Sequence, residues 1–189
     1  RAEALGFAGV DVGETQSTPF LPLLLAAEHS TNLQLMTTVA IAFPRSPFVT
    51  AQTAWELQRY SAGRFVLGLG TQVKGHNERR FSSPWEPPGP RMRDYIRCLR
   101  AVWDSFQHGT PPSYQGDFYT FTLLPPFFNP GPISVPPPPI HIAGVNRYML
   151  RLAGEECDGV VLHSFNTLKY TQDVVLPSLE EGARRAARS

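Results

Sequence analysis

The stretch Arg64-Phe65-Val66-Leu67-Gly68-Leu69-Gly70 decides the fold of this 189-residue chain. Before it stands the helix-ending signal Ser61-Ala62-Gly63, and the apolar run itself closes on Gly-x-Gly. This order predicts a helix, a tight turn and then a buried parallel strand. In α/β folds, ligands bind at the carboxyl ends of parallel strands. We therefore expect Gly68 and Gly70 to lie at a ligand site where the backbone comes close to the ligand.

Turn and periodicity signals divide the rest of the sequence into alternating strands and helices. The expected strands cover residues 7–13, 33–43, 65–70, 140–144 and 158–163. The expected helices cover residues 19–29, 47–60, 92–107 and 147–155, and a last helix begins near residue 171. A long polar loop is expected over residues 71–90. A hairpin and a proline-rich connector, at about 109–139, are interpreted as an ordered insertion within a single domain that spans residues 1–189.

Strands that alternate with helices predict a parallel sheet, which belongs to the α/β class. A doubly wound sheet and a (β/α)8 TIM barrel both satisfy this pattern. No glycine-rich dinucleotide fingerprint follows the first expected strand, where Gly13-Glu14-Thr15-Gln16 stands, and this favours the barrel. A full barrel needs roughly 250 residues. About five βα units therefore predict an incomplete TIM barrel, in which the first strand and the last strands are missing.

The composition limits which kinds of binding partner are expected. The 17 basic and 16 acidic residues give a formal net charge of +1, which argues against nucleic acid or an anionic membrane surface. No apolar run approaches the roughly 20 residues that a membrane span requires. Cys98 and Cys157 are expected to be buried free thiols, as in a reducing compartment. We expect a cytoplasmic protein whose partner is a small-molecule substrate.

Five segments resemble the bacterial luciferase-like monooxygenase superfamily, and most closely its branch that uses the deazaflavin coenzyme F420. These segments are residues 37–47, 61–70, 76–80, 139–144 and 157–161. The resemblance implies a TIM barrel of the luciferase-like type and an oxidoreductase that transfers a hydride between F420 and a small organic substrate. An FMN-dependent luciferase-like monooxygenase is the alternative with the same fold. The resemblance is also compatible with a homodimer.

The resemblance further implies which residues hold the cofactor. The family carries a non-proline cis peptide bond at the end of its third strand, here at Thr38–Val39 give or take one residue, and this bulge backs one face of the flavin ring. Asn77 matches a residue that contacts the cofactor from the loop after the fourth strand. The cofactor-binding positions implied in this chain are Thr38, Val39, Ala40, Gly68, Gly70, Asn77, Ala143, Gly144 and Val145.

Two residues that follow strands are the catalytic candidates. Glu14 comes just after the first expected strand, where it could give a proton or hydrogen-bond a substrate, or simply begin the next helix as a solvated acid. His163 closes the strand at 158–163 and is expected to line the same pocket. His141 begins its strand, so it is expected at the opposite end of the barrel from His163, and His-x-His is absent. No metal site is therefore predicted.

Departures from the family pattern leave other functions open. No histidine follows the first expected strand, and Lys74 stands where some relatives have an acid, three residues before Asn77. Both departures disfavour a sugar-phosphate dehydrogenase, and the missing histidine leaves a non-catalytic cofactor-binding barrel as a second alternative. A glycosidase that uses Asp11 and Glu14 would need a further acid at a strand end. The strands at 33–43, 65–70 and 140–144 do not supply one.

Overall fold

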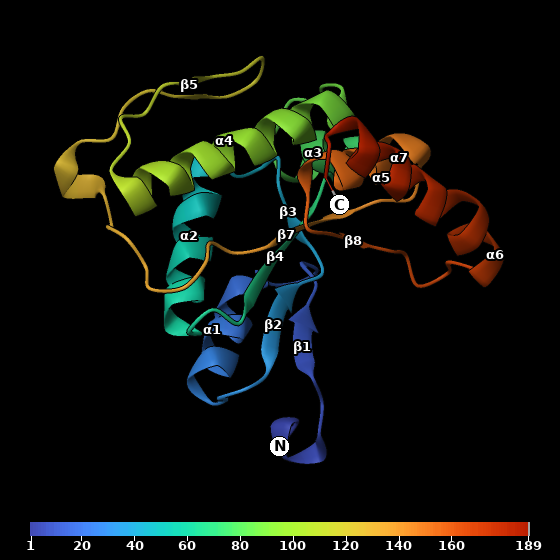
Figure 1. Ribbon diagram of the computed structural model, residues 1–189, viewed down its shortest axis with the longest axis horizontal. Coiled ribbons are helices and arrows are strands. Elements are labelled where there is room, and N and C mark those ends of the chain that lie inside the picture. Colours follow the sequence, from blue (N-terminus) through green and yellow to red (C-terminus); the bar gives the residue numbers. More distant parts are fainter. Residues whose placement is uncertain (189) are drawn as a thin grey trace.

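The computed structural model describes residues 1–188 and is built around a twisted parallel sheet (Figure 1). The strands follow the order β1-β2-β4-β7-β8, and β3 pairs with β4 beyond the end of β2. Their bounds are Gly9–Val12 for β1, Gln34–Thr37 for β2, Ala40–Ile41 for β3, Phe65–Gly70 for β4, Ile140–Ala143 for β7 and Gly159–Val161 for β8. All these pairings are parallel, as the alternation of strands and helices predicts.

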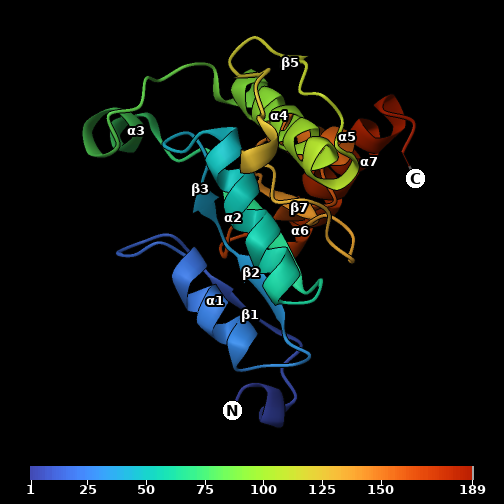
Figure 2. The same ribbon diagram turned by 90° about the vertical axis from the view of Figure 1, so that its left-hand side faces the viewer.

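Helices connect the strands and cover one face of the sheet. They are α1 (Phe20–Glu28), α2 (Pro47–Tyr60), α3 (Lys74–Arg80), α4 (Pro88–His108), α5 (Arg147–Glu156), α6 (Leu168–Tyr170) and α7 (Leu176–Arg185). A π-helical segment, Thr171–Val175, joins α6 to α7. Helix α1 packs on β1 and β2, α2 packs on β4, and α5 packs on β7 and β8; Figure 2 shows α1 and α2 side by side in front of the strands. A sheet covered by its helices on one face is part of a TIM barrel and not a doubly wound sheet.

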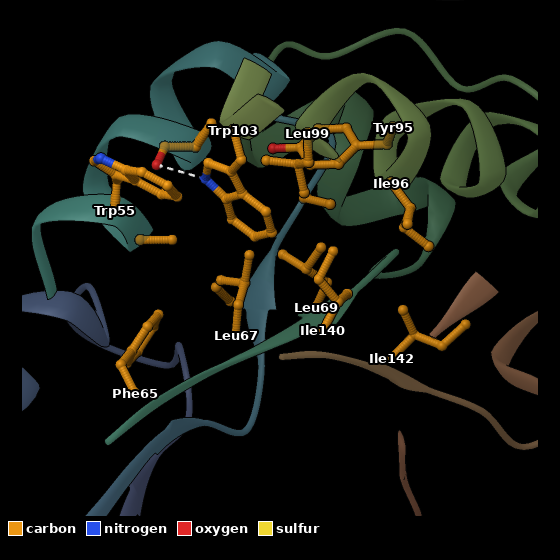
Figure 3. Packing of buried hydrophobic residues seen from close by; sticks show 14 of the residues in the cluster. Trp55, Phe65, Leu67, Leu69, Tyr95, Ile96, Leu99, Trp103, Ile140 and Ile142 are labelled. Carbon is orange, nitrogen blue, oxygen red and sulfur yellow. Dashed lines mark hydrogen bonds between the residues drawn. The ribbon is translucent and has the colours of Figure 1, made fainter. Parts of the chain in front are cut away.

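The core lies between the covered face of the sheet and the helices (Figure 3). Phe65, Leu67 and Leu69 alternate along β4 and are fully buried, because every second side chain of a strand faces the same way. They meet Trp55 of α2 and Trp103 of α4, whose ring centroids lie 6.4 Å apart. The Nε1–H of Trp103 donates to the carbonyl oxygen of Ala51 at 3.1 Å, and the remaining labelled core residues are Tyr95, Ile96, Leu99, Ile140 and Ile142.

Three expected elements differ from the structure. The single strand expected over residues 33–43 is two strands, because the cis peptide bond at Thr38–Val39 interrupts it. That bond lies at the position that the family resemblance implies, so this expectation is confirmed. The loop expected over residues 71–90 contains α3. Helix α4 begins at Pro88 and not at Met92. The N–H groups of the first turn of a helix have no partner within the helix, so a proline, which lacks an N–H, is tolerated there.

The insertion after α4 contains the expected hairpin. Strands β5 (Tyr114–Gln115) and β6 (Thr120–Phe121) pair antiparallel. The buried carboxylate of Asp94 on α4 accepts hydrogen bonds from the backbone N–H groups of Phe118 and Tyr119, at 2.6 and 2.9 Å, and from the Tyr114 hydroxyl. Gly116 permits this approach, since a Cβ there would lie 1.8 Å from Asp94 Oδ1. One carboxylate thus fastens the hairpin to α4.

Helices α5 and α7 touch backbone to backbone. A Cβ atom on Gly154 would lie 2.1 Å from the carbonyl oxygen of Leu179, and one on Gly182 would lie 2.1 Å from that of Arg151. Neither position has room for a side chain. Ion pairs border this crossing, with Arg151 and Glu181 3.7 Å apart across it. The two helices are therefore packed as closely as their main chains allow.

Candidate functional site

A groove of about 700 Å³ lies on the face of the sheet that the helices leave open. The residues that line it come from β1, β2, β7 and β8 and from the turns at their carboxyl ends: Gly9, Val10, Asp11, Gln34, Met36, Thr38, Val39, Ala143, Val145, Val161, Leu162, His163 and Ser164. Most of them are apolar, and within residues 1–188 the titratable side chains among them are those of Asp11 and His163. The groove therefore offers an apolar surface with a few polar groups, as small-molecule sites do.

The Thr38–Val39 bulge forms one wall of the groove. Thr38 and Val39 both line it, whereas Ala40 is 1% exposed and lies behind them. The backbone N–H of Thr38 donates to the carbonyl oxygen of Val12 at 2.9 Å. The Thr38 hydroxyl donates to the carboxylate of Asp11. Of the three positions implied here, two therefore face the groove and the third supports them.

Gly68 and Gly70 lie where β4 comes close to the neighbouring strand. A Cβ on Gly68 would lie 1.9 Å from the carbonyl oxygen of Thr37, and one on Gly70 would lie 2.5 Å from Cγ2 of Val39. Within the described chain neither glycine belongs to the groove lining. That a ligand also approaches these two glycines stays a prediction. They lack side chains because the bulge of the neighbouring strand occupies that space.

Glu14 is held in a nearly buried ion pair. Its side chain is 8% exposed, and Arg45 Nη2 lies 2.7 Å from its Oε1. Arg45 Nη1 and the backbone N–H of Ile41 both donate to its Oε2, each at 2.8 Å. Both carboxylate oxygens are thus occupied by hydrogen bonds. This burial contradicts the solvated interpretation, and within residues 1–188 Glu14 does not line the groove.

His163 lies at the carboxyl end of β8, across the groove from Asp11 on β1. Its Nδ1 accepts a hydrogen bond from the backbone N–H of Phe165 at 3.2 Å, and the two rings stack with centroids 5.4 Å apart. In the neutral imidazole the proton is therefore on Nε2. This geometry leaves one donor free to meet a ligand.

The residues after β7 contribute the wall beside His163. Ala143 and Val145 line the groove, while Gly144 is buried behind them. A Cβ on Gly144 would lie 3.2 Å from both Leu150 Cδ2 and Val160 Cγ2, so the turn packs tightly there. The hydroxyl of Tyr170 donates to the carbonyl oxygen of Val145 at 2.7 Å. Sequence reasoning did not single out Tyr170, because nothing in its local pattern reports a contact with a turn 25 residues earlier.

Asn77 is fully buried on α3, at the end of β4. Its Nδ2 donates to the carbonyl oxygens of Thr71 and Val73, at 3.0 and 3.2 Å. Its Oδ1 has no hydrogen-bond partner within residues 1–188. Buried polar atoms normally have one. Asn77 is not part of the groove lining within residues 1–188, and its contact with a cofactor stays a prediction from the resemblance.

His141 and His163 occupy opposite ends of their strands, as expected. His141 lies beside the start of β8, where a Cβ on Gly159 would lie 2.5 Å from its Nε2. Burial lowers the pKa of His141 below its ordinary value. Across residues 1–188, no group of three or more His, Cys, Asp or Glu side chains is arranged to hold a metal ion. None of the helices in that range is long and apolar enough to cross a membrane.

Comparisons with known proteins agree with this architecture. An uncharacterized protein of Mycobacterium tuberculosis is 44% identical over 186 residues, which are 98% of this chain and 55% of that protein. A 5,10-methylenetetrahydromethanopterin reductase of Archaeoglobus fulgidus is 29% identical over 88% of this chain and 47% of its own length. The chain thus spans about half the length of the curated relatives that it matches.

Solved structures share the fold over the whole chain. An F420-dependent secondary alcohol dehydrogenase, in complex with an F420–acetone adduct, superposes with a TM-score of 0.85 at 21% identity and covers 100% of this chain and 58% of its own. The oxygenating constituent of 3,6-diketocamphane monooxygenase from Pseudomonas putida, in complex with FMN, gives a TM-score of 0.76 at 18% identity, over 100% and 56%. The fold is therefore a portion of a luciferase-like TIM barrel.

A family model described as luciferase-like monooxygenase matches residues 1–189. The match agrees with the parallel half-barrel, the Thr38–Val39 bulge and the groove at the strand ends. This chain belongs to the luciferase-like monooxygenase family.

Proposed function

We propose that this chain forms the cofactor-binding part of an oxidoreductase that transfers a hydride between coenzyme F420 and a small organic substrate. The observation that carries the proposal is the groove at the strand ends, with Thr38 and Val39 on one side and His163 on another. A relative is named as an F420-dependent glucose-6-phosphate dehydrogenase, and a structural neighbour as an F420-dependent alcohol dehydrogenase, which supports the choice of cofactor.

The residues present fit a flat organic ring. Val39, Ala143, Val145 and Val161 offer apolar contacts, and a groove of about 700 Å³ is within the range of roughly 300–1,000 Å³ that ligand pockets span. When bound, a deazaflavin supplies the hydride chemistry, whereas the protein supplies orientation and exclusion of water. In this proposal Val39 backs the ring, and the turn at residues 143–145 holds the side of the cofactor that carries its phosphate.

His163 is the residue that we propose to move a proton. Hydride transfer to a substrate leaves a substrate oxygen or nitrogen that must take up a proton, and the reverse reaction must remove one. The Nε2–H of His163 is the free donor, because Nδ1 is already held by Phe165. Proton transfer by a placed side chain contributes roughly 10²–10⁴-fold to rate.

A flavin-dependent monooxygenase is the second candidate. The likeness to an FMN-bound monooxygenase favours it. The same groove, with its mostly apolar lining, would accept either tricyclic ring.

A fluorescence titration of the 189-residue chain with F420 and, separately, with FMN tests the proposal. Val145→Glu serves as the disrupting variant because Val145 lines the groove and is 60% exposed. Val49→Glu is its matched control, because Val49 on α2 is 51% exposed and is not part of the groove lining within residues 1–188.

Binding of F420 that V145E weakens and V49E leaves unchanged would support the deazaflavin enzyme. Binding of FMN alone, with the same response to the two variants, would replace it with the flavin enzyme. A folded chain that binds neither cofactor would overturn the proposal for this chain.

A further inference from the structure

Glu14 was the expected proton donor, yet the structure gives its carboxylate another set of contacts. The side chain follows β1 and turns toward the segment between β2 and β4. There it accepts three hydrogen bonds, two from Arg45 and one from the backbone N–H of Ile41. Both carboxylate oxygens are therefore engaged in hydrogen bonds within the protein.

Arg45 is held as firmly as Glu14. Its Nη1 also donates to the carbonyl oxygen of Ile41 at 2.9 Å, and its guanidinium lies over the ring of Phe20, 5.6 Å from the ring centroid. The planar fork of an arginine matches both oxygens of a carboxylate. Glu14, Arg45 and the backbone of Ile41 therefore form one closed set of contacts, which we call the Glu14 clamp.

The Glu14 clamp contacts the segment at the Thr38–Val39 bulge, which forms one wall of the groove. The backbone N–H of Glu14 donates to the carbonyl oxygen of Val39 at 3.2 Å, so Glu14 contacts the segment at Val39 and again at Ile41. On the other side, β3 is paired with β4, and the N–H of Ala42 donates to the carbonyl oxygen of Gly70. The N–H of Ile41 therefore points away from β4, and Glu14 satisfies a group that the sheet leaves unpaired.

We infer that Glu14 is a positioning residue, which together with Arg45 fixes Val39 against the groove. Val39 has no polar side chain of its own, and within residues 1–188 the hydrogen bonds that join the segment 39–41 to the end of β1 are those with Glu14. Loosening the Glu14 clamp would displace the groove wall without removing any atom that touches a ligand. This inference rests on the proposed function only in assigning the cofactor as the occupant of the groove.

The test compares two ion pairs of similar burial. In the Glu14–Arg45 pair the side chains are 8% and 23% exposed; in the Glu155–Arg93 pair, between α5 and α4, they are 12% and 29% exposed. The variants Glu14→Gln and Glu155→Gln each remove one buried charge with almost no change of shape. Arg45→Lys provides a second, milder disruption of the Glu14 clamp, should E14Q not fold.

Two measurements are made on each variant alongside its melting temperature. The first is the affinity for F420 and for FMN by fluorescence titration. The second is hydrogen–deuterium exchange of a peptide covering residues 37–43, which reports on the wall without any ligand. A misplacement of about 1 Å outside the reacting atoms can cost roughly 100-fold in function, so we expect E14Q and R45K to weaken binding about tenfold or more.

The expected pattern is faster exchange of residues 37–43 and weaker binding in E14Q and R45K, with E155Q unchanged in both despite a lower melting temperature. Unchanged exchange in E14Q or R45K, or exchange that E155Q accelerates equally, would overturn the positioning role. A wild-type chain that binds neither cofactor would overturn the proposed function instead, while the exchange measurement would still decide the role of Glu14.

Discussion

Thr37 and Gly68 exchange two hydrogen bonds across neighbouring strands. The Thr37 hydroxyl donates to the carbonyl oxygen of Gly68 at 2.7 Å and accepts from its N–H at 2.8 Å. The pair joins β2 to β4 where β2 ends and the groove wall begins.

Gly68→Ala is expected to destabilise the protein, because a Cβ there would lie 1.9 Å from the backbone oxygen of Thr37. Overpacking a core typically costs about 1–3 kcal/mol, and backbone cannot move aside as a flexible side chain can. Urea denaturation should therefore show a free energy of unfolding lower by about 2 kcal/mol or more. Gly109→Ala is the comparison, since its Cβ would meet nothing within 4 Å although its φ is +69°. Equal losses in the two variants would contradict the steric explanation.

Asp94→Ala is expected to release the hairpin from α4. The substitution removes the acceptor for the N–H groups of Phe118 and Tyr119 and for the Tyr114 hydroxyl. Leaving buried donors without a partner costs roughly 1–3 kcal/mol. Limited proteolysis should cut D94A near residues 116–118 faster than the wild type. Asp104→Ala, at an exposed position on the same helix, should leave the cleavage rate unchanged; if it does not, general loosening of α4 is the cause.

The stability of the fold should fall in mild acid because of His141. Burial lowers its pKa in the folded state, whereas the unfolded chain has an ordinary value near 6.5. The unfolded state therefore binds more protons, and stability is lost as the pH falls through the ordinary pKa. Melting temperatures measured between about pH 7.5 and pH 5 should decline less steeply in His141→Gln than in the wild type. Parallel curves for the two proteins would assign the acid sensitivity to other groups.

Both thiols should be unreactive until the protein unfolds. Cys98 and Cys157 are buried and unpaired, and burial raises the pKa of each thiol to about 12. Because the thiolate is the nucleophile, its population at pH 8 is very small. Ellman's reagent should detect almost no thiol in the native chain and both thiols in urea. Rapid native labelling would show that one of the helices carrying them opens readily.

His163→Gln should separate binding from chemistry, if the proposed function holds. The Gln oxygen can replace Nδ1 as the acceptor for Phe165, so cofactor affinity is expected to stay within about twofold. Turnover of any alcohol or ketone that the enzyme accepts should fall roughly 10²–10⁴-fold. The substitution His76→Gln, on the exposed part of α3, is the control for general effects. A loss of affinity without a loss of turnover would make His163 a binding residue.

Local chemistry was enough to predict most of the fold. The apolar run from Phe65 to Leu69 predicted β4, and the helix expected over residues 47–60 is α2, which begins at Pro47 with Ser46 accepting a hydrogen bond from the N–H of Val49. The break of the strand after Thr37 could not be predicted from periodicity, since Thr38, Val39 and Ala40 have the composition of a continuing strand. Family resemblance supplied that position, and the structure confirms it.

The site was harder to predict for a physical reason. A sequence shows which residues follow a strand but not which long-range partner takes up their polar atoms. The carboxylate of Glu14 was expected to be available to a substrate, but Arg45, 31 residues later, donates a hydrogen bond to it. Gly68 and Gly70 were correctly expected to be points of close approach, and the structure shows the neighbouring strand beside both of them. His163, Val39 and Val145 face the groove as expected, because their neighbours leave them free.

The close packing of α5 against α7 at Gly154 and Gly182 helps to hold one wall of the groove in place. Val145 leads into α5, and Tyr170, which holds the Val145 carbonyl, leads through the π-helical segment into α7. Because Gly154 and Gly182 leave no gap between the two helices, α5 and α7 form one tightly packed pair. The turn at Val145 and Tyr170, which hydrogen-bonds to it, are both attached to this pair. Substitutions on the outward surface of these helices are thus free to accumulate over evolution, whereas any that separates the two helices would also disturb the turn at Val145 in the groove wall.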